Sequence, residues 1–120
     1  MIEGIIITIS QKMLKEKGVL PWTRQFLSTM NNPESTYWMR QGACPKRDIS
    51  YVYLCIGGFV KYRAYFGGTH SGNVELTDAD GSVRSMYAKA WIVLAGPVER
   101  PSHPIPMRGF RGFRYTEKLF

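Results

Sequence analysis

The spacing of hydrophobic residues changes along the chain, with a helical period in the first third and strand-like alternation after residue 35. The β-branched run Ile5-Ile6-Ile7 predicts a buried strand. Ser10 can cap a short helix over Gln11–Lys17, which Gly18 can end. Pro21 suits the first turn of a second helix. Its apolar stripe predicts core packing and consists of Trp22, Phe26 and Met30.

The middle of the chain predicts a β-hairpin. Ser50–Ile56 alternates as a strand, with Val52, Leu54 and Ile56 on one face and Tyr51, Tyr53 and Cys55 on the other. Gly57-Gly58 is typical of a two-residue hairpin turn. The returning strand, Phe59–Phe66, is expected to point Val60, Tyr62, Ala64 and Phe66 inward. Its other face is basic and aromatic, with Phe59, Lys61, Arg63 and Tyr65.

The remaining pattern predicts several more short strands. We expect Gly67-Gly68 to close the returning strand, a polar loop over Thr69–Asn73, and strands over Val74–Thr77 and Ser82–Tyr87. Ala88–Ala95 is apolar on both faces and is expected to be the central strand, which Gly96-Pro97 stops. A short strand over Tyr37–Met39 and a closing strand over Phe110–Tyr115 complete the set. The prediction is one α+β domain over residues 1–120, a small, partly closed mixed β-barrel of five to seven strands with two short N-terminal helices.

Composition narrows the class of protein without fixing its function. Sixteen Lys and Arg against nine Asp and Glu give a net charge of +7, which attracts polyanions. The hydrophobic fraction of 44% is too high for a disordered chain. We expect a cytoplasmic protein, because the N-terminus lacks a signal-peptide pattern and no apolar run is long enough for a membrane span. The sequence does not decide whether Cys44 and Cys55 form a disulfide. Two buried, reduced thiols are the more ordinary interpretation.

The side chains that carry catalysis are sparse. The two histidines, His70 and His103, have no closely spaced Cys or His partner, so we expect no metal and no cofactor. Asp78-Ala79-Asp80-Gly81 lacks the distal ligands of a calcium loop and is interpreted as a turn. No phosphate-binding glycine motif occurs. The sequence therefore favours a protein that is not an enzyme.

The strongest chemical signal is a basic and aromatic pattern near the C-terminus. Five cations occur from Arg100 to Lys118, interleaved with Phe110, Phe113, Tyr115 and Phe120. Single-stranded nucleic acid binds cations through its phosphates and aromatic rings through its bases. The alternative is a closing strand with core aromatics and a solvated basic face. Strand alternation points Phe110 and Phe113 to opposite faces, which leaves both accounts open.

The order of elements resembles the PUA-like superfamily and, within it, the ASCH-type domains. The resemblance rests on IIITISQKMLKEKG, PKRDISYVYLCIGGFVKYRA and AKAWIVLAGPVERPSHPIPMRGFRGFRY, and covers most of the chain. ASCH domains carry a GxKxxExR signature, but this chain has GVLPWTRQ from Gly18, which puts Leu20, Thr23 and Gln25 at the Lys, Glu and Arg positions. The resemblance thus implies that hydrolytic activity is lost while binding in a cleft for RNA or a modified base is kept. It also implies that Trp38 and Arg40 lie near that cleft.

These observations predict a nucleic-acid-binding module for RNA or another single strand. The residues expected to bind are Trp38, Arg40, Lys46, Arg47, Lys61, Arg63, Tyr65, Arg108, Arg111 and Arg114, with Trp38 and Tyr65 as the stacking faces. The alternative is a small protein-interaction module, such as a mobile-element accessory or inhibitor protein that docks on a host complex. A third possibility is an enzyme acting on a modified nucleoside, which would need a pocket lined by Thr23, Lys17 and a carboxylate.

Overall fold

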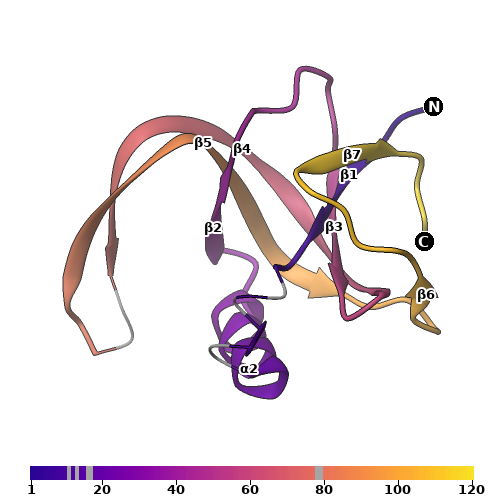
Figure 1. The fold of residues 1–120 in the computed structure, drawn as a ribbon, viewed down its shortest axis with the longest axis horizontal. Coiled ribbons are helices and arrows are strands. Elements are labelled where there is room, and N and C mark those ends of the chain that lie inside the picture. Colours follow the sequence, from indigo (N-terminus) through magenta and orange to yellow (C-terminus); the bar gives the residue numbers. More distant parts are fainter. Residues whose placement is uncertain (11, 13, 16–17, 78–79) are drawn as a thin grey trace.

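The computed structural model describes residues 1–10, 12, 14–15, 18–77 and 80–120 of the chain. It consists of one mixed sheet and a helix packed near one end of the sheet (Figure 1). The elements are β1 (Gly4–Thr8), α2 (Val19–Met30), β2 (Thr36–Gln41), β3 (Tyr51–Ile56), β4 (Phe59–Thr77), β5 (Val83–Glu99), β6 (Ile105–Pro106) and β7 (Phe113–Thr116). The described part of the chain is therefore mostly β-sheet, with one short helix. The expected first helix falls largely outside the described residues.

The sheet is open, which corrects the prediction of a partly closed barrel. Its strand order is β2-β5-β4-β3-β1-β7, with β6 paired to β4 off this path. The two end strands, β2 and β7, do not pair with each other among the described residues. β1 and β3 are parallel and the other pairs are antiparallel, so the sheet is mixed as expected. β5 lies between β2 and β4 rather than at the centre, because β3 and β1 extend the sheet on the far side of β4.

The two faces of β3 bury two different clusters, as its alternation predicts. Val52, Leu54 and Ile56 belong to the main core, together with Phe26 and Met30 of α2. Tyr53 and Cys55 belong to a smaller cluster on the opposite face. The predicted inward set of β4 holds for Tyr62, Ala64 and Phe66, but Val60 joins the smaller cluster. A register shift between Leu54 and Cys55 reverses the face of the residues beyond it.

The turn at Gly57-Gly58 is confirmed, since both residues have positive φ angles of 59° and 87°. Three other segments were wrongly predicted to end or interrupt a strand. β4 continues through Gly67-Gly68 and through the expected loop Thr69–Asn73, and β5 continues through Gly96-Pro97. The register between β4 and β5 shifts at Gly67-Gly68 and at Gly96-Pro97. These residues therefore form bulges within the paired strands and do not end the pairing.

The result is one long hairpin in place of several short strands. The predicted strands Val74–Thr77, Ser82–Tyr87 and Ala88–Ala95 are parts of β4 and β5, which pair with each other as far as Thr77 and Val83. Figure 1 shows the outer half of this hairpin curving away from the rest of the molecule. We call this outer half, β4 from Gly67 to Thr77 and β5 from Val83 to Lys89, the arm.

Candidate nucleic-acid interface

A broad cleft lies between the arm, β2 and the segment before β7. Its volume is about 1480 Å³. β2 contributes Trp38 and Arg40, and the segment Gly109–Gly112 forms another side of the cleft. Small-molecule sites usually have volumes of roughly 300–1,000 Å³. This cleft is larger, which favours an extended chain as its occupant.

The charge of the cleft is positive. Four cationic side chains line it, and no Asp or Glu is among its described lining residues; the four are Arg40, Arg84, Lys89 and Arg111. They come from β2, from β5 and from the segment before β7, so the charge surrounds the space instead of following one strand. Walls of one sign around a hollow focus the potential and raise the local concentration of counterions. The cleft therefore attracts an anionic ligand.

Aromatic rings line the same space. Trp38 is half-buried and packs edge-on against Trp91, with 6.2 Å between ring centroids, and against His70, with 5.7 Å. Trp91 is fully buried and donates a hydrogen bond from Nε1 to the carbonyl oxygen of Gly72 at 2.9 Å. These contacts hold Trp38 in place on the cleft wall. Tyr87 of β5 lines the cleft as well and is 59% exposed.

Three of the residues expected from sequence therefore meet at one site: Trp38, Arg40 and Arg111. Three further residues with a cationic or exposed aromatic side chain also line it and were not predicted: Arg84, Tyr87 and Lys89. The apolar pattern of Ala88–Ala95 predicts burial on both faces, but Lys89 is exposed. The alternation of Tyr87, Lys89 and Trp91, which places all three on one face of a continuous β5, could have found Tyr87 and Lys89 but not Arg84.

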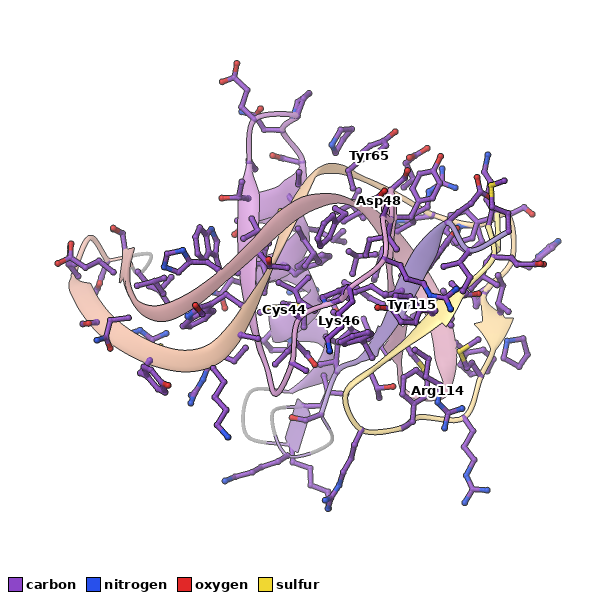
Figure 2. All side chains as sticks on the ribbon, turned by 90° about the horizontal axis from the view of Figure 1, so that it is seen from above. Cys44, Lys46, Asp48, Tyr65, Arg114 and Tyr115 are labelled. Atoms are coloured by element: carbon purple, nitrogen blue, oxygen red, sulfur yellow. The ribbon has the colours of Figure 1, made fainter. Side chains whose placement is uncertain are left out.

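A second group of the expected residues lies around β7 and forms a separate basic patch. The Arg47 guanidinium lies over the Tyr115 ring, 5.4 Å from its centroid, and the backbone N–H of Lys46 donates to the Tyr115 hydroxyl at 2.7 Å. Arg114 lies over the ring of Phe110, 4.3 Å from its centroid. Figure 2 shows Lys46 beside Tyr115, with Arg114 and Tyr65 at opposite sides of the view.

The closing segment serves the core as well as the surface. Phe113 and Tyr115 pack against the main core and Phe110 against the smaller cluster, so the two phenylalanines point to opposite faces as predicted. The closing strand itself is shorter than expected, since β7 begins at Phe113. Arg108 is exposed and is not among the residues that line the cleft.

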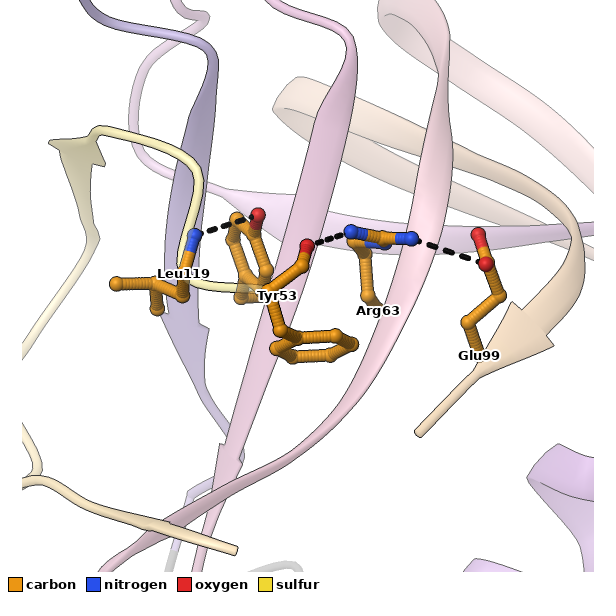
Figure 3. A network of polar contacts seen from close by, with 5 residues as sticks. Tyr53, Arg63, Glu99 and Leu119 are labelled. Carbon is orange, nitrogen blue, oxygen red and sulfur yellow. Dashed lines mark hydrogen bonds and ion pairs between the residues drawn. The ribbon is translucent and has the colours of Figure 1, made fainter. Parts of the chain in front are cut away.

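Arg63 is not on an open surface. It is 8% exposed and forms an ion pair with Glu99, with 2.9 Å between Nη2 and Oε2. Its other terminal nitrogen donates to the main-chain oxygen of Phe120, and its guanidinium lies between the rings of Tyr51 and Phe120, at 4.4 and 4.7 Å from their centroids. Figure 3 shows this chain of contacts, which the hydrogen bond from the Leu119 N–H to the Tyr53 hydroxyl extends.

The network around Glu99 also engages Tyr65. The hydrogen bond from Arg63 holds the pKa of Glu99 below its usual range. A hydrogen bond to the Glu99 carboxylate raises the pKa of the Tyr65 hydroxyl, although the ring of Tyr65 is still 39% exposed. Lys61 lies elsewhere, at a small hollow of about 240 Å³ that it shares with Arg100. Tyr65, Arg63 and Lys61 thus lie outside the cleft.

The alternative chemistries find little support among the described residues. These residues include no group of three or more His, Cys, Asp or Glu side chains that could hold a metal ion. Cys44 and Cys55 are both free thiols, and burial raises the pKa of Cys55. Thr23 does not line the cleft, and Lys17 lies outside the described residues. No helix in the described part of the chain is long and apolar enough to cross a membrane.

Comparisons of the chain with protein-family models, with curated proteins and with solved structures found no match.

Proposed function

We propose that this protein binds single-stranded nucleic acid, RNA in particular, in the cleft between the arm, β2 and the segment Gly109–Gly112. The observation that carries the proposal is the pairing of four cationic side chains with aromatic rings around one cleft that has no described carboxylate. The size of the cleft matches an extended polymer better than a small ligand. We retain the PUA-like resemblance as part of this proposal, on the order of the first strand, the helix and the following sheet.

Each kind of lining residue has a distinct role in this proposal. Arg40, Lys89 and Arg111 contact phosphates, because their charges reach an open space that water and ions can enter. Tyr87 and Trp38 offer ring faces to the bases, and Tyr87 is the more exposed of the two. Phosphate contacts and stacking both tolerate any base, so affinity depends weakly on sequence and steeply on salt.

The basic patch around β7 is a separate, weaker contribution. Arg47 and Arg114 both lie over aromatic rings, which fixes their guanidinium groups at the surface. Longer strands that leave the cleft past Phe110 would reach Arg114, because that arginine covers a ring which itself lines the cleft. Affinity is therefore expected to increase with the length of the strand until it spans both regions.

The test is fluorescence anisotropy with a labelled single-stranded RNA across a salt series, with duplex RNA and duplex DNA for comparison. The variant Arg40→Gln/Arg111→Gln removes two cleft charges. Arg24→Gln/Arg100→Gln removes the same charge from exposed positions outside the cleft and is the matched control. For a single strand, each lost phosphate contact lowers the slope of log K against log salt by about 0.7, so the cleft variant should lose about 1.4.

The control variant separates binding in the cleft from attraction by net charge. If both double variants weaken binding equally, only the overall charge of +7 matters and the proposal fails. No binding near physiological salt would also refute it. If the proposal holds, Tyr87→Leu should weaken binding by about 1–3 kcal/mol, because it removes a stacking face. It should leave the slope of log K against log salt unchanged, because it removes no charge.

A protein-interaction module remains the second candidate, and one observation favours it. The arm exposes Val83 at 61% and Tyr87 at 59%, among the most exposed large hydrophobic side chains described in the structure. Exposed apolar side chains on a projecting ribbon are typical of a contact with another polypeptide.

A further inference from the structure

The outer edge of β5 in the arm carries no neighbouring strand among the described residues. β2 pairs with β5 from Ala95 to Ala90 and ends there at Gln41. Beyond Ala90 the described pairs of β5, from Ala88 to Val83, are all with β4. Figure 1 shows the arm standing clear of the rest of the sheet and of α2. Alternate main-chain N–H and C=O groups of this part of β5 therefore point away from β4 and can pair with another strand.

The cleft runs along this open edge. Four consecutive residues of β5, from Met86 to Lys89, line it. Successive side chains of a strand point to opposite faces of the sheet, so a space that touches all four reaches both faces and includes the edge between them. Gly42, directly after β2, also lines the cleft, and apart from its chain neighbours nothing lies within 4 Å of where its Cβ would be. The space next to the end of β2 is therefore open within the described structure.

The charge along the edge is positive at both of its ends. Arg84 lies in the outer part of the described arm and Lys89 at its base, and both line the cleft. They point to opposite faces of the sheet, so cations flank the edge on both sides. Arg40 adds a third cation near the end of β2, and the segment Val83–Lys89 contains no acidic residue. Glu75 lies on β4, one strand further from the edge, and does not line the cleft.

We infer that this edge binds an acidic polypeptide segment, which adds to the sheet as a new strand beside β5 and in line with β2. In strand addition the main-chain hydrogen bonds give affinity, and side-chain contacts at alternate positions give specificity. The acidic side chains of the segment pair with Arg84 on one face and with Lys89 on the other. Its apolar side chains pack against Val83 and Tyr87, which are 61% and 59% exposed. A strand of about seven residues, at about 3.3 Å per residue, covers the edge.

Two other occupants fit the edge less well. A second copy of this chain would bring the cations of its own β5 edge, Arg84 and Lys89, against the same cations here, and like charges on neighbouring strands are destabilising. A nucleic-acid strand matches the charge of the cleft. It does not offer the alternating N–H and C=O groups, at the spacing of a strand, that continue the ladder of β5.

Strand addition goes beyond the proposed function and does not depend on it. A peptide on β5 and a nucleic-acid strand would occupy the same cleft, so each excludes the other. A protein with an exposed acidic segment would therefore control the access of nucleic acid to the cleft.

The test uses the full chain and a labelled peptide of about seven residues in which glutamate and valine alternate, with both ends blocked. Fluorescence anisotropy measures binding, and NMR measures the exchange of each β5 amide hydrogen with solvent. The amides that face β4 should already be protected in the free protein. The outward-facing amides, at every second position from Val83 to Lys89, should exchange about 10-fold more slowly or less when the peptide saturates the protein, because each gains a hydrogen bond.

A matched peptide and a matched variant separate strand addition from attraction by charge. A peptide of alternating glutamate and proline keeps the charge and is extended, but proline has no N–H and does not join a ladder; it should bind at least about 10-fold more weakly. Arg84→Gln/Lys89→Gln should weaken binding of the valine peptide by about 3- to 10-fold, because two cross-strand charge pairs are lost. Arg24→Gln/Arg100→Gln, exposed outside the cleft, is the control and should leave binding unchanged.

Three results would overturn strand addition: no binding of the valine peptide up to about 1 mM, equal binding of the two peptides, or binding that leaves exchange of the outward-facing amides unchanged. Outward-facing amides that are protected in the free protein, together with a dimer in sedimentation velocity, would assign the edge to a second copy and overturn it as well. Binding of single-stranded RNA without binding of the peptide would leave the proposed function intact. Protection by the peptide without binding of RNA would refute the proposed function alone.

Discussion

Replacing Arg63 with Met tests whether the buried guanidinium holds the C-terminal segment on the sheet. The Arg63 side chain is 9% exposed and bridges two acceptors, the Glu99 carboxylate and the main-chain oxygen of Phe120. Its removal leaves both acceptors without this donor. Met fills much of the same space but donates no hydrogen bond, so the substitution isolates the polar contacts from packing.

The expected loss can be built up from the contacts of Arg63. Hydrogen bonds to charged groups contribute about 1.5–3 kcal/mol each, and each of the two ring contacts with Tyr51 and Phe120 contributes about 0.5–1 kcal/mol. Two effects reduce the sum. Glu99 is 40% exposed and can regain water, and the neutral Met side chain avoids the cost of desolvating a cation. We expect the free energy of unfolding to fall by about 2–4 kcal/mol, a large part of the stability of a small domain.

Urea denaturation followed by tryptophan fluorescence measures this change directly. Arg63→Lys keeps the charge but loses the planar guanidinium group that reaches two acceptors. Its decrease in the free energy of unfolding should therefore lie between zero and that of Arg63→Met. A loss below about 0.5 kcal/mol for Arg63→Met would refute the reasoning, because ordinary surface substitutions have effects of that size. It would mean that the network contributes nothing net to stability.

Three further predictions concern the core and its ionisable groups. The pKa of Glu99 is lowered in the fold, so its stabilising contribution is complete above its ordinary value of 4.5 and is lost as pH falls through the folded value. Stability of the wild type should therefore decrease in acid more than that of Glu99→Gln, as measured by urea midpoints from about pH 7 to about pH 3. Gly96→Ala should lower the free energy of unfolding by about 1–3 kcal/mol, since its Cβ would collide with the carbonyl oxygen of Asn32, whereas Gly42→Ala, with nothing within 4 Å, should be neutral in the same assay. Cys44 should react with a thiol reagent in the folded protein and Cys55 only after unfolding, because Cys55 is buried; equal rates would contradict its burial.

The local sequence pattern was sufficient to predict those features of the fold that depend only on residues close together in the chain. The alternation of β3 correctly assigned its two faces, because the side-chain period of a strand is a property of the backbone alone. The stripe of α2 placed Phe26 and Met30 in the core for the same reason. The Gly57-Gly58 turn followed from the positive φ angles that only such residues adopt readily.

Tertiary structure decided everything that depends on partners distant in the sequence. Gly67-Gly68 and Gly96-Pro97 are turn signals locally, but the neighbouring strand accommodates them as bulges, and this makes β4 and β5 one long hairpin. Arg63 is a basic strand residue in the sequence, and its burial depends on Glu99 and Phe120, which lie 36 and 57 residues away. The cleft likewise joins Arg40, Lys89 and Arg111 from three separate segments. Composition established that the chain is basic, but only the packing of the sheet determined which of its cations share one space.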